Sequence, residues 1–205
     1  MVIRAVVFDI GDVVLVEHGW EARKVLADKF GFSEEEFGKF AKSRLKDSYV
    51  GKFSAEDFFG ELKELLKIEA SVEELIRTWI DVRKESTRFV EGVDEVVKAL
   101  KGNYVLASLT DTTVLNDVVR KEFGVYDLFD FNVTSPVVGF RKPDRETYEE
   151  LLGKMKEKGV AADEVVFIDD EVENLEPAME LGMKTILFEG FEGMERGLLE
   201  LGVEI

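Results

Sequence analysis

The fold of this chain is decided by the stretch IRAVVFDIGD, residues 3–12. Its first six residues are mostly apolar and partly β-branched, and an aspartate and a glycine follow, which is typical of a short buried strand. A strand that is apolar on both faces belongs inside a parallel sheet covered by helices on both sides. The stretch therefore predicts the centre of an α/β fold, with Asp9 at the carboxyl end of a strand.

A long block of amphipathic helices follows this strand. Apolar residues recur at helical spacing, Ser54 and Ser71 are placed as N-caps, and Ser33 opens a Ser-Glu-Glu-Glu capping box. The block is too long for a simple crossover between strands, so we predict an all-helical cap at residues 16–86, inserted into a core of residues 1–15 and 87–205. Its predicted helices are Glu21–Phe30, Ser33–Lys46, Ser54–Leu66 and Ser71–Lys84, and we expect its aromatic residues Phe53, Phe58, Phe59 and Trp79 to form its core.

Strands and helices alternate after Thr87. This alternation predicts a Rossmann-like parallel sheet with helices on both faces, and it places hinges between core and cap near residues 15–20 and 87–92. The predicted strands are Tyr104–Leu109, Phe131–Val133, Val165–Ile168 and Lys184–Phe188, and the predicted helices are Val93–Leu100, Thr113–Phe123, Arg145–Lys158, Glu173–Leu181 and Phe191–Leu201.

The charge and composition of the 205 residues exclude several classes of function. A net charge of −17 disfavours nucleic acids and anionic membranes as partners. The absence of cysteine excludes disulfides and thiolate metal sites. The sequence shows neither a signal peptide nor a membrane span, so we expect a cytoplasmic protein. It does not determine the oligomeric state, for which we expect a monomer. Abundant Glu and Lys, with no Gln and few Asn, indicate a heat-adapted source.

Polar residues follow the predicted strands where ligands bind to open parallel sheets, at their carboxyl edge. Clustered carboxylates are costly unless a cation holds them. Mg2+ prefers oxygen ligands, so Asp9, Asp170 and the carbonyl of Gly11 are candidate ligands. A carboxylate can also attack phosphorus, and Lys142, the Thr110 hydroxyl and helix N–H groups are candidate donors to phosphoryl oxygens.

Four motifs in this order resemble those of the haloacid dehalogenase-like hydrolase superfamily, and the helical insertion resembles that family's C1 cap. The similarity is strongest to its small sugar phosphatases. It implies that Asp9 is the nucleophile, Thr110 binds phosphate and Lys142 neutralises both. It also implies that Asp170 is a metal ligand with Asp169 and Asn174 beside it. The motifs are Phe8-Asp9-Ile10-Gly11-Asp12-Val13, Thr110-Asp111, Arg141-Lys142-Pro143-Asp144 and Asp169-Asp170-Glu171-Val172-Glu173-Asn174.

Gly11 departs from the family pattern, in which phosphatases usually carry an acid/base aspartate at this position. General acid–base help is worth roughly two to four orders of magnitude in rate. Without this aspartate, we expect a small phosphorylated substrate with a good leaving group. Alternatively, another residue acts as the proton donor, and Asp12 and His18 are the nearest in sequence. The rival functions are a metal-independent dehalogenase, and a protein that binds a phosphate ligand with little catalysis.

Other candidate residues keep two interpretations each. Thr110 and Asp111 fit both an N-cap pair and a substrate-binding pair. Arg141 is placed either to contact substrate or to form a salt bridge to the cap, and Asn174 either beside the metal or as a helix cap. His18, the only histidine, is either a structural residue of the link or a substrate contact.

Overall fold

The predicted first strand is the middle of the sheet in the computed structural model, which describes residues 2–17 and 20–205 except the side chain of Trp20. Strand β1 (Ala5–Phe8) pairs in parallel with a strand on each side, in the sheet order β5-β4-β1-β6-β7. All neighbours in this sheet are parallel, which confirms the predicted Rossmann-like core. The other four strands are β4 (Val105–Thr110), β5 (Phe131–Thr134), β6 (Val165–Asp169) and β7 (Lys184–Leu187).

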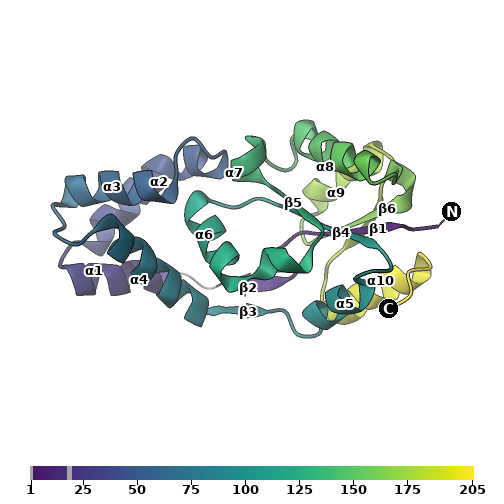
Figure 1. The fold of residues 1–205 in the computed structure, drawn as a ribbon, viewed down its shortest axis with the longest axis horizontal. Helices are drawn as coiled ribbons and strands as arrows, with labels where there is room; N and C mark the ends of the chain where they lie inside the picture. The colour runs from purple at the N-terminus through teal and green to yellow at the C-terminus, as the bar shows by residue number, and fades with distance from the viewer. Residues whose placement is uncertain (1, 18–19) are drawn as a thin grey trace.

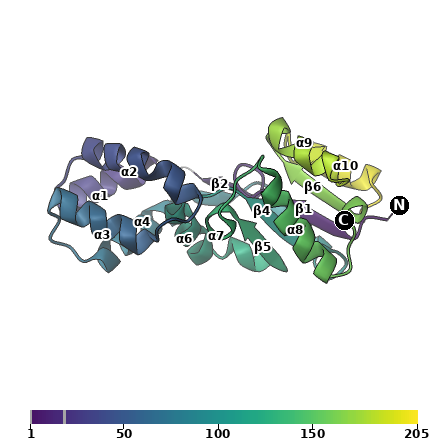
Figure 2. The same cartoon turned by 90° about the horizontal axis from the view of Figure 1, so that it is seen from above.

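Helices cover both faces of the sheet. Successive side chains of β1 point to opposite faces, and all of them are apolar, so both faces need a cover. Val6 and Phe8 belong to an apolar cluster with α5 and α10, whereas Ala5 and Val7 belong to a second cluster with α8 and α9. Figure 1 shows these two helix pairs on opposite sides of the central strands. Both termini lie at the same end of the molecule (Figures 1 and 2). The covering helices are α5 (Val93–Leu100), α8 (Arg145–Glu157), α9 (Val172–Glu180) and α10 (Phe191–Glu200).

The helical block lies at the far end of the molecule from the termini (Figure 1). It buries Phe58, Phe59 and Trp79 in one apolar cluster, as predicted, and Phe53 packs against that cluster half-buried. Residues of α6 join the cluster, so this core helix supports the block. The block consists of α1 (Trp20–Phe30), α2 (Glu34–Tyr49), α3 (Ala55–Leu66) and α4 (Val72–Glu85), and the core helix is α6 (Val114–Phe123).

Serine side chains cap three of these helices, as the sequence predicts. Ser33, Ser54 and Ser71 each accept a hydrogen bond from the amide three residues later. The full capping box forms at Ser54, where the Asp57 carboxylate accepts a hydrogen bond from the Ser54 amide. Among the described residues, Ser33 forms only one of the two bonds of the predicted box, the one from the Glu36 amide.

Two short strands at the predicted hinges were missed. Strand β2 (Leu15–Glu17) pairs antiparallel with β3 (Thr87–Phe89), so the two segments that connect the core to the helical block lie side by side. Three residues are too few to show a strand period, and only the folded chain brings these segments together. The sequence also gave no signal for α7 (Ser135–Val138) and the single turns η1 (Val125–Leu128) and η2 (Ala162–Glu164).

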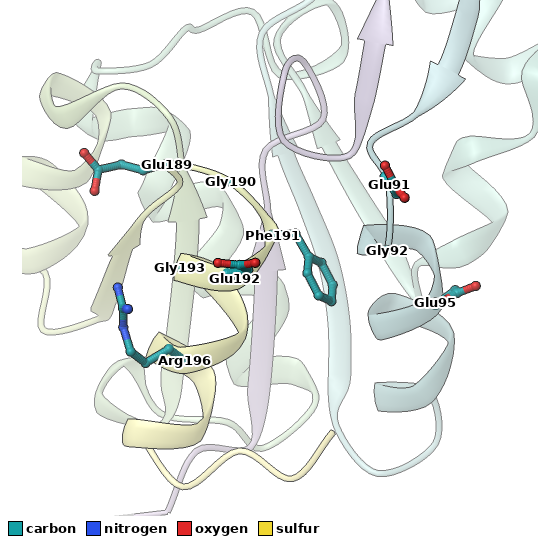
Figure 3. Close-up of a pocket in the computed structure, with 9 residues that line it drawn as sticks. All are labelled: Glu91, Gly92, Glu95, Glu189, Gly190, Phe191, Glu192, Gly193 and Arg196. Carbon is teal, nitrogen blue, oxygen red and sulfur yellow. The ribbon is translucent and has the colours of Figure 1, made fainter.

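A close contact between Gly92 and Phe191 joins the starts of α5 and α10 (Figure 3). Gly92 is the N-cap of α5 with φ +80°, and a Cβ there would lie 2.7 Å from the Phe191 ring. Glycine therefore meets both the backbone and the packing requirement at this position.

In the described parts of the chain, we find no helix with the length and apolar character that crossing a membrane requires.

We predict that Gly92→Ala destabilises the protein by about 1–2 kcal/mol, because alanine in a left-handed conformation is strained and its methyl group would displace the Phe191 ring. Thermal and urea unfolding measure this loss. Gly153→Ala is the matched control: Gly153 is inside α8 with no heavy atom within 4 Å of an added Cβ. That control should gain up to about 1 kcal/mol, and equal stabilities of the two variants would contradict the account.

Candidate active site

The carboxyl ends of three neighbouring strands bring buried polar side chains together. Phe8 is in register with Ser108 of β4 and Ile168 of β6, so the residue after β1, Asp9, lies level with Asp169. The Asp9 amide donates to the Ile168 carbonyl at 2.9 Å. Thr110 ends β4 one residue further on, and like Asp9 and Asp169 it is less than a tenth exposed.

Lys142 enters this edge from the loop between α7 and α8. Its Nζ lies 3.0 Å from Asp9 Oδ1 and 2.6 Å from Asp169 Oδ2, and its side chain is 3% exposed. The Lys142 amide donates to Asp111 Oδ1 at 3.1 Å, which fixes the loop. One ammonium group therefore bridges the acids of β1 and β6.

Asp169 is held in place by donors on its other oxygen. Its Oδ1 accepts hydrogen bonds from the Glu171 amide at 2.9 Å and from Asn174 Nδ2 at 3.0 Å. Asn174 Nδ2 also donates to the Glu171 carboxylate, and the Asn174 carbonyl accepts from Tyr148. Asn174 thus orients Asp169 and lies beside the acid cluster, one of the two places considered from the sequence.

Burial and mutual repulsion shift the pKa values of the cluster. Burial, then the charges of Asp9 and Asp169, raise the pKa of Asp170 to about 6. Burial also raises the pKa of Asp169 against the opposing effect of Lys142. Burial alone would lower the pKa of Lys142, but the charges of Asp9 and Asp169 outweigh it, so the net shift is upward. Lys142 is therefore an ammonium group at neutral pH.

The residues present fit a divalent cation. Ligand oxygens of Asp9, Asp169 and Asp170 all lie within 4.8 Å of one another. Asp9 Oδ1 is buried and has no hydrogen-bond partner in the described parts of the chain, although it lies close to Lys142. Three carboxylates face one ammonium group, and a cation with a preference for oxygen ligands would offset the remaining charge. Magnesium matches this donor set.

Arg120 of α6 lies beside Gly11, the position that departs from the family pattern. A Cβ added to Gly11 would be 3.4 Å from Arg120 Nη2. The Arg120 guanidinium pairs with Glu17 of β2 at 2.6 Å and donates to Thr110 Oγ1 at 3.0 Å. A buried arginine thus connects the Gly11 backbone with the predicted phosphate-binding hydroxyl.

Asp111 and Arg141 contact one another rather than standing free. Arg141 Nε donates to Asp111 Oδ2 at 3.1 Å, and burial raises the pKa of Asp111 despite this neighbour. The Arg141 guanidinium also lies 3.9 Å from the ring centroid of Tyr49, at the end of α2. Arg141 therefore joins the Lys142 loop to the helical block, through an aromatic ring rather than the salt bridge considered from the sequence. His18 lies outside the described residues.

A cavity of about 810 Å³ between the starts of α5 and α10 is unsuited to phosphate (Figure 3). None of the predicted site residues lines it. Four of its lining side chains are glutamates, whose charges repel an anion. These glutamates are Glu91, Glu95, Glu189 and Glu192.

Comparison with known families decides the classification. The sequence profile described as hydrolase, haloacid dehalogenase-like hydrolase, matches residues 3–182. The chain belongs to the haloacid dehalogenase-like hydrolase family. One relative of this hydrolase is D-ribitol-5-phosphate phosphatase of Bacteroides thetaiotaomicron, 24% identical over 89% of this chain and 90% of that protein. Another is flavin mononucleotide hydrolase 1 of Arabidopsis thaliana, 25% identical over 57% of this chain. This chain spans less than half the length of some curated relatives. The match covers 47% of the Arabidopsis protein, and a match to drimenol cyclase of Aspergillus calidoustus covers 36% of the cyclase.

Solved structures share the fold of this hydrolase. The HAD family enzyme bt-2542 of Bacteroides thetaiotaomicron, in complex with magnesium and inorganic phosphate, aligns with a TM-score of 0.71 and 19% identity over 92% of this chain and 95% of that one. A HAD-like family hydrolase of Porphyromonas gingivalis aligns with a TM-score of 0.67 and 23% identity over the full length of both chains.

The ion pair between Glu17 and Arg120 could hardly be predicted from the sequence. Glu17 ends an apolar run from Val13 to Val16, which is a weak sign that its side chain is buried. Arg120 is followed by Lys121 in its helix, and nothing in the sequence separates it from an exposed arginine. Pairing across 103 residues becomes visible only in the fold.

We predict that Mg2+ binding weakens as the pH falls through about 6, the pKa of Asp170 in the metal-free protein. Protons and the cation compete for the same carboxylates, so affinity is highest where Asp170 is ionised and falls below that pKa. Calorimetric titration of Mg2+ between about pH 5 and about pH 8 measures this.

Asp170→Asn is the control for this titration. It should bind Mg2+ more weakly and with a smaller pH dependence, because one titrating ligand is gone. Without metal it should unfold at a higher temperature than the parent at neutral pH, since the neutral amide avoids both the burial of a charge and the repulsion by Asp9 and Asp169. An affinity that stays constant over the whole pH range would contradict the assignment.

Proposed function

We propose that this hydrolase cleaves a small phosphate monoester, of the sugar-phosphate kind, through an aspartyl-phosphate on Asp9. The observation that carries the proposal is the Asp9 carboxylate, buried, 3.0 Å from Lys142 Nζ, with an oxygen that no hydrogen bond satisfies in the described part of the chain. The names of two relatives, a ribitol-phosphate phosphatase and a flavin mononucleotide hydrolase, support this substrate class.

The phosphoryl group binds where positive charge and donors converge. Lys142 offers its ammonium group, and Thr110 offers its hydroxyl from the end of the neighbouring strand. These groups offset the negative charge that would otherwise repel the phosphate from Asp9. The helix N–H groups expected from the sequence as further donors are mostly engaged within the protein. The amides of Val114 and Asn116, at the start of α6, donate to the hydroxyls of Ser48 and Thr113.

Catalysis proceeds in two displacements at phosphorus. An Asp9 carboxylate oxygen attacks phosphorus, and the bond from phosphorus to the leaving-group oxygen breaks. The leaving group keeps the electron pair of that bond. Water then attacks the same phosphorus, the bond to Asp9 breaks, and inorganic phosphate leaves with the Asp9 carboxylate restored. Lys142 stays protonated throughout, held by Asp9 and Asp169.

Asp9, Asp170 and the Gly11 carbonyl are the proposed ligands of Mg2+, with Asp169 and Asn174 beside them. When bound, the ion supplies positive charge at the phosphoryl oxygens and at the acid cluster. Asn174 and the Glu171 amide fix Asp169, so the cluster is oriented before substrate binds.

Residues 16–86 are the proposed cap, which would exclude bulk water from the phosphoryl group. The β2–β3 pair carries both connections to this segment. Arg141 lies on Tyr49 of α2 and pairs with Asp111 in the core, so it joins the two parts beside the site. Asp111 and Arg141 are the proposed substrate-facing pair, with His18 as a further candidate contact.

The clustered carboxylates argue against a dehalogenase, whose attack on carbon needs no metal ion. Gly11 is the one observation in favour of a binding protein with little turnover, because it removes the usual acid. Our proposal instead pairs Gly11 with a substrate whose leaving group needs little protonation, such as an anomeric or acyl phosphate.

We predict that Asp9→Asn lowers phosphate release by at least about four orders of magnitude, because an amide cannot attack phosphorus. Release of inorganic phosphate with Mg2+ present, over a panel of sugar, nucleotide and acyl phosphates, measures the change. Glu173→Gln, an exposed position on nearby α9, is the control and should keep the parental rate.

Turnover by Asp9→Asn at the parental rate would overturn the mechanism. Parental turnover that persists in a chelator would turn the proposal toward metal-free chemistry. Tight binding of a phosphate ester without turnover by the parent protein would favour the binding function.

A further inference from the structure

The buried ion pair between Glu17 and Arg120 is the feature that the proposed mechanism leaves unused. The two side chains are 9% and 4% exposed. Arg120 donates from Nε to both Glu17 oxygens, at 3.2 and 3.1 Å, and from Nη2 to Oε2 at 2.6 Å. This two-point contact fixes the plane and direction of the guanidinium group.

Arg120 controls the hydroxyl of Thr110. Its Nη1 donates to Thr110 Oγ1 at 3.0 Å. A guanidinium group can only donate, so Thr110 must be the acceptor in this bond and its own proton must point elsewhere. The only other partner of this hydroxyl in the described residues is the Asp111 carbonyl at 3.5 Å, the outer limit for a hydrogen bond. The proton is therefore free for a phosphoryl oxygen.

Gly11 belongs to the same arrangement. An added Cβ there would be in van der Waals contact with Arg120 Nη2, at 3.4 Å. A longer acidic side chain from this position would reach the guanidinium group and compete with Glu17 for it. An aspartate at position 11 would thus be held as an ion-pair partner rather than left free to transfer protons.

We infer that Arg120, held by Glu17, is a positioning residue that presents the Thr110 hydroxyl as a donor to the phosphoryl group. This inference rests on the proposed phosphatase function and deepens it. Arg120 acts through Thr110, and glycine at position 11 keeps the guanidinium group free for this task. The arrangement orders phosphate binding, and it supplies no proton to the leaving group.

A double-mutant cycle tests this role. Glu17→Gln with Arg120→Met removes both charges together, so no buried carboxylate is stranded. Thr110→Val removes the hydroxyl, and a third protein carries all three changes. Each is assayed for kcat and KM with p-nitrophenyl phosphate and for inhibition by inorganic phosphate. Lys121→Met, an exposed cation next to Arg120 on α6, controls for the loss of charge.

Loss of the Arg120 pair and loss of the hydroxyl should each weaken phosphate inhibition and kcat/KM on the order of tenfold. The triple variant should lose no more phosphate inhibition or kcat/KM than the paired change or Thr110→Val alone, because the Arg120 pair and the hydroxyl act through one hydrogen bond. Lys121→Met should stay within about twofold of the parent. Arg120→Lys retains the charge but not the two-point contact. Adding Thr110→Val to Arg120→Lys should therefore cause no further loss of phosphate inhibition or kcat/KM.

Multiplying effects in the triple variant, or an unchanged inhibition constant without Arg120, would overturn the inference. If the paired change yields no folded protein, Arg120→Lys with Thr110→Val completes the same cycle and decides the question. Phosphate release by the parent protein separates the two claims. A parent without turnover contradicts the proposed function, whereas an active parent with uncoupled variants contradicts only the role of Arg120.

Discussion

The contact of the Lys142 ammonium group with the carboxylates of Asp9 and Asp169 is the interaction on which the rest of the site depends. It lies in the interior of the protein, where an unpaired charge of either sign is expensive. One ammonium group does not balance three carboxylates. Burial first, and then the charges of Asp9 and Asp169, raise the pKa of Asp170. A divalent cation would relieve the excess of negative charge, so in the proposed function the electrostatic imbalance of the metal-free protein favours metal binding.

The sheet is what makes this concentration of charge possible. Parallel strands end at one edge, and the buried residues of β1 set the register that places Asp9 level with Asp169. Apolar clusters on both faces hold the strands while the acids repel one another. Lys142 is delivered by a loop that Asp111 and Arg141 fix, and the same arginine reaches the helical block at Tyr49. The site and the proposed cap are thus connected through residues that also shape the active edge.

The role of Lys142 toward Asp9 was implied by the family resemblance, and their contact is seen only in the fold. The sequence itself was sufficient to predict the parallel core and the acids at the strand ends, because both followed from local patterns beside buried strands. It was insufficient for β2 and β3, since three-residue strands show no period and pair only through the fold. Arg120 was missed for a related reason: its burial depends on Glu17, which is 103 residues away. Side chains that act through long-range ion pairs carry no local signal, whereas residues that end apolar strands do. The boundaries of the cap and the roles of the individual site residues stay predictions.

The most direct test of the central claim is to locate the cation. Crystals soaked with Mn2+, which shares the oxygen ligands of Mg2+ and scatters anomalously, would be measured at a wavelength where manganese contributes strongly. We predict an anomalous peak within bonding distance of the carboxylates of Asp9 and Asp170, with Lys142 still against Asp9. A map with no peak at this edge, or with the ion bound elsewhere and the two carboxylates apart, would contradict the account.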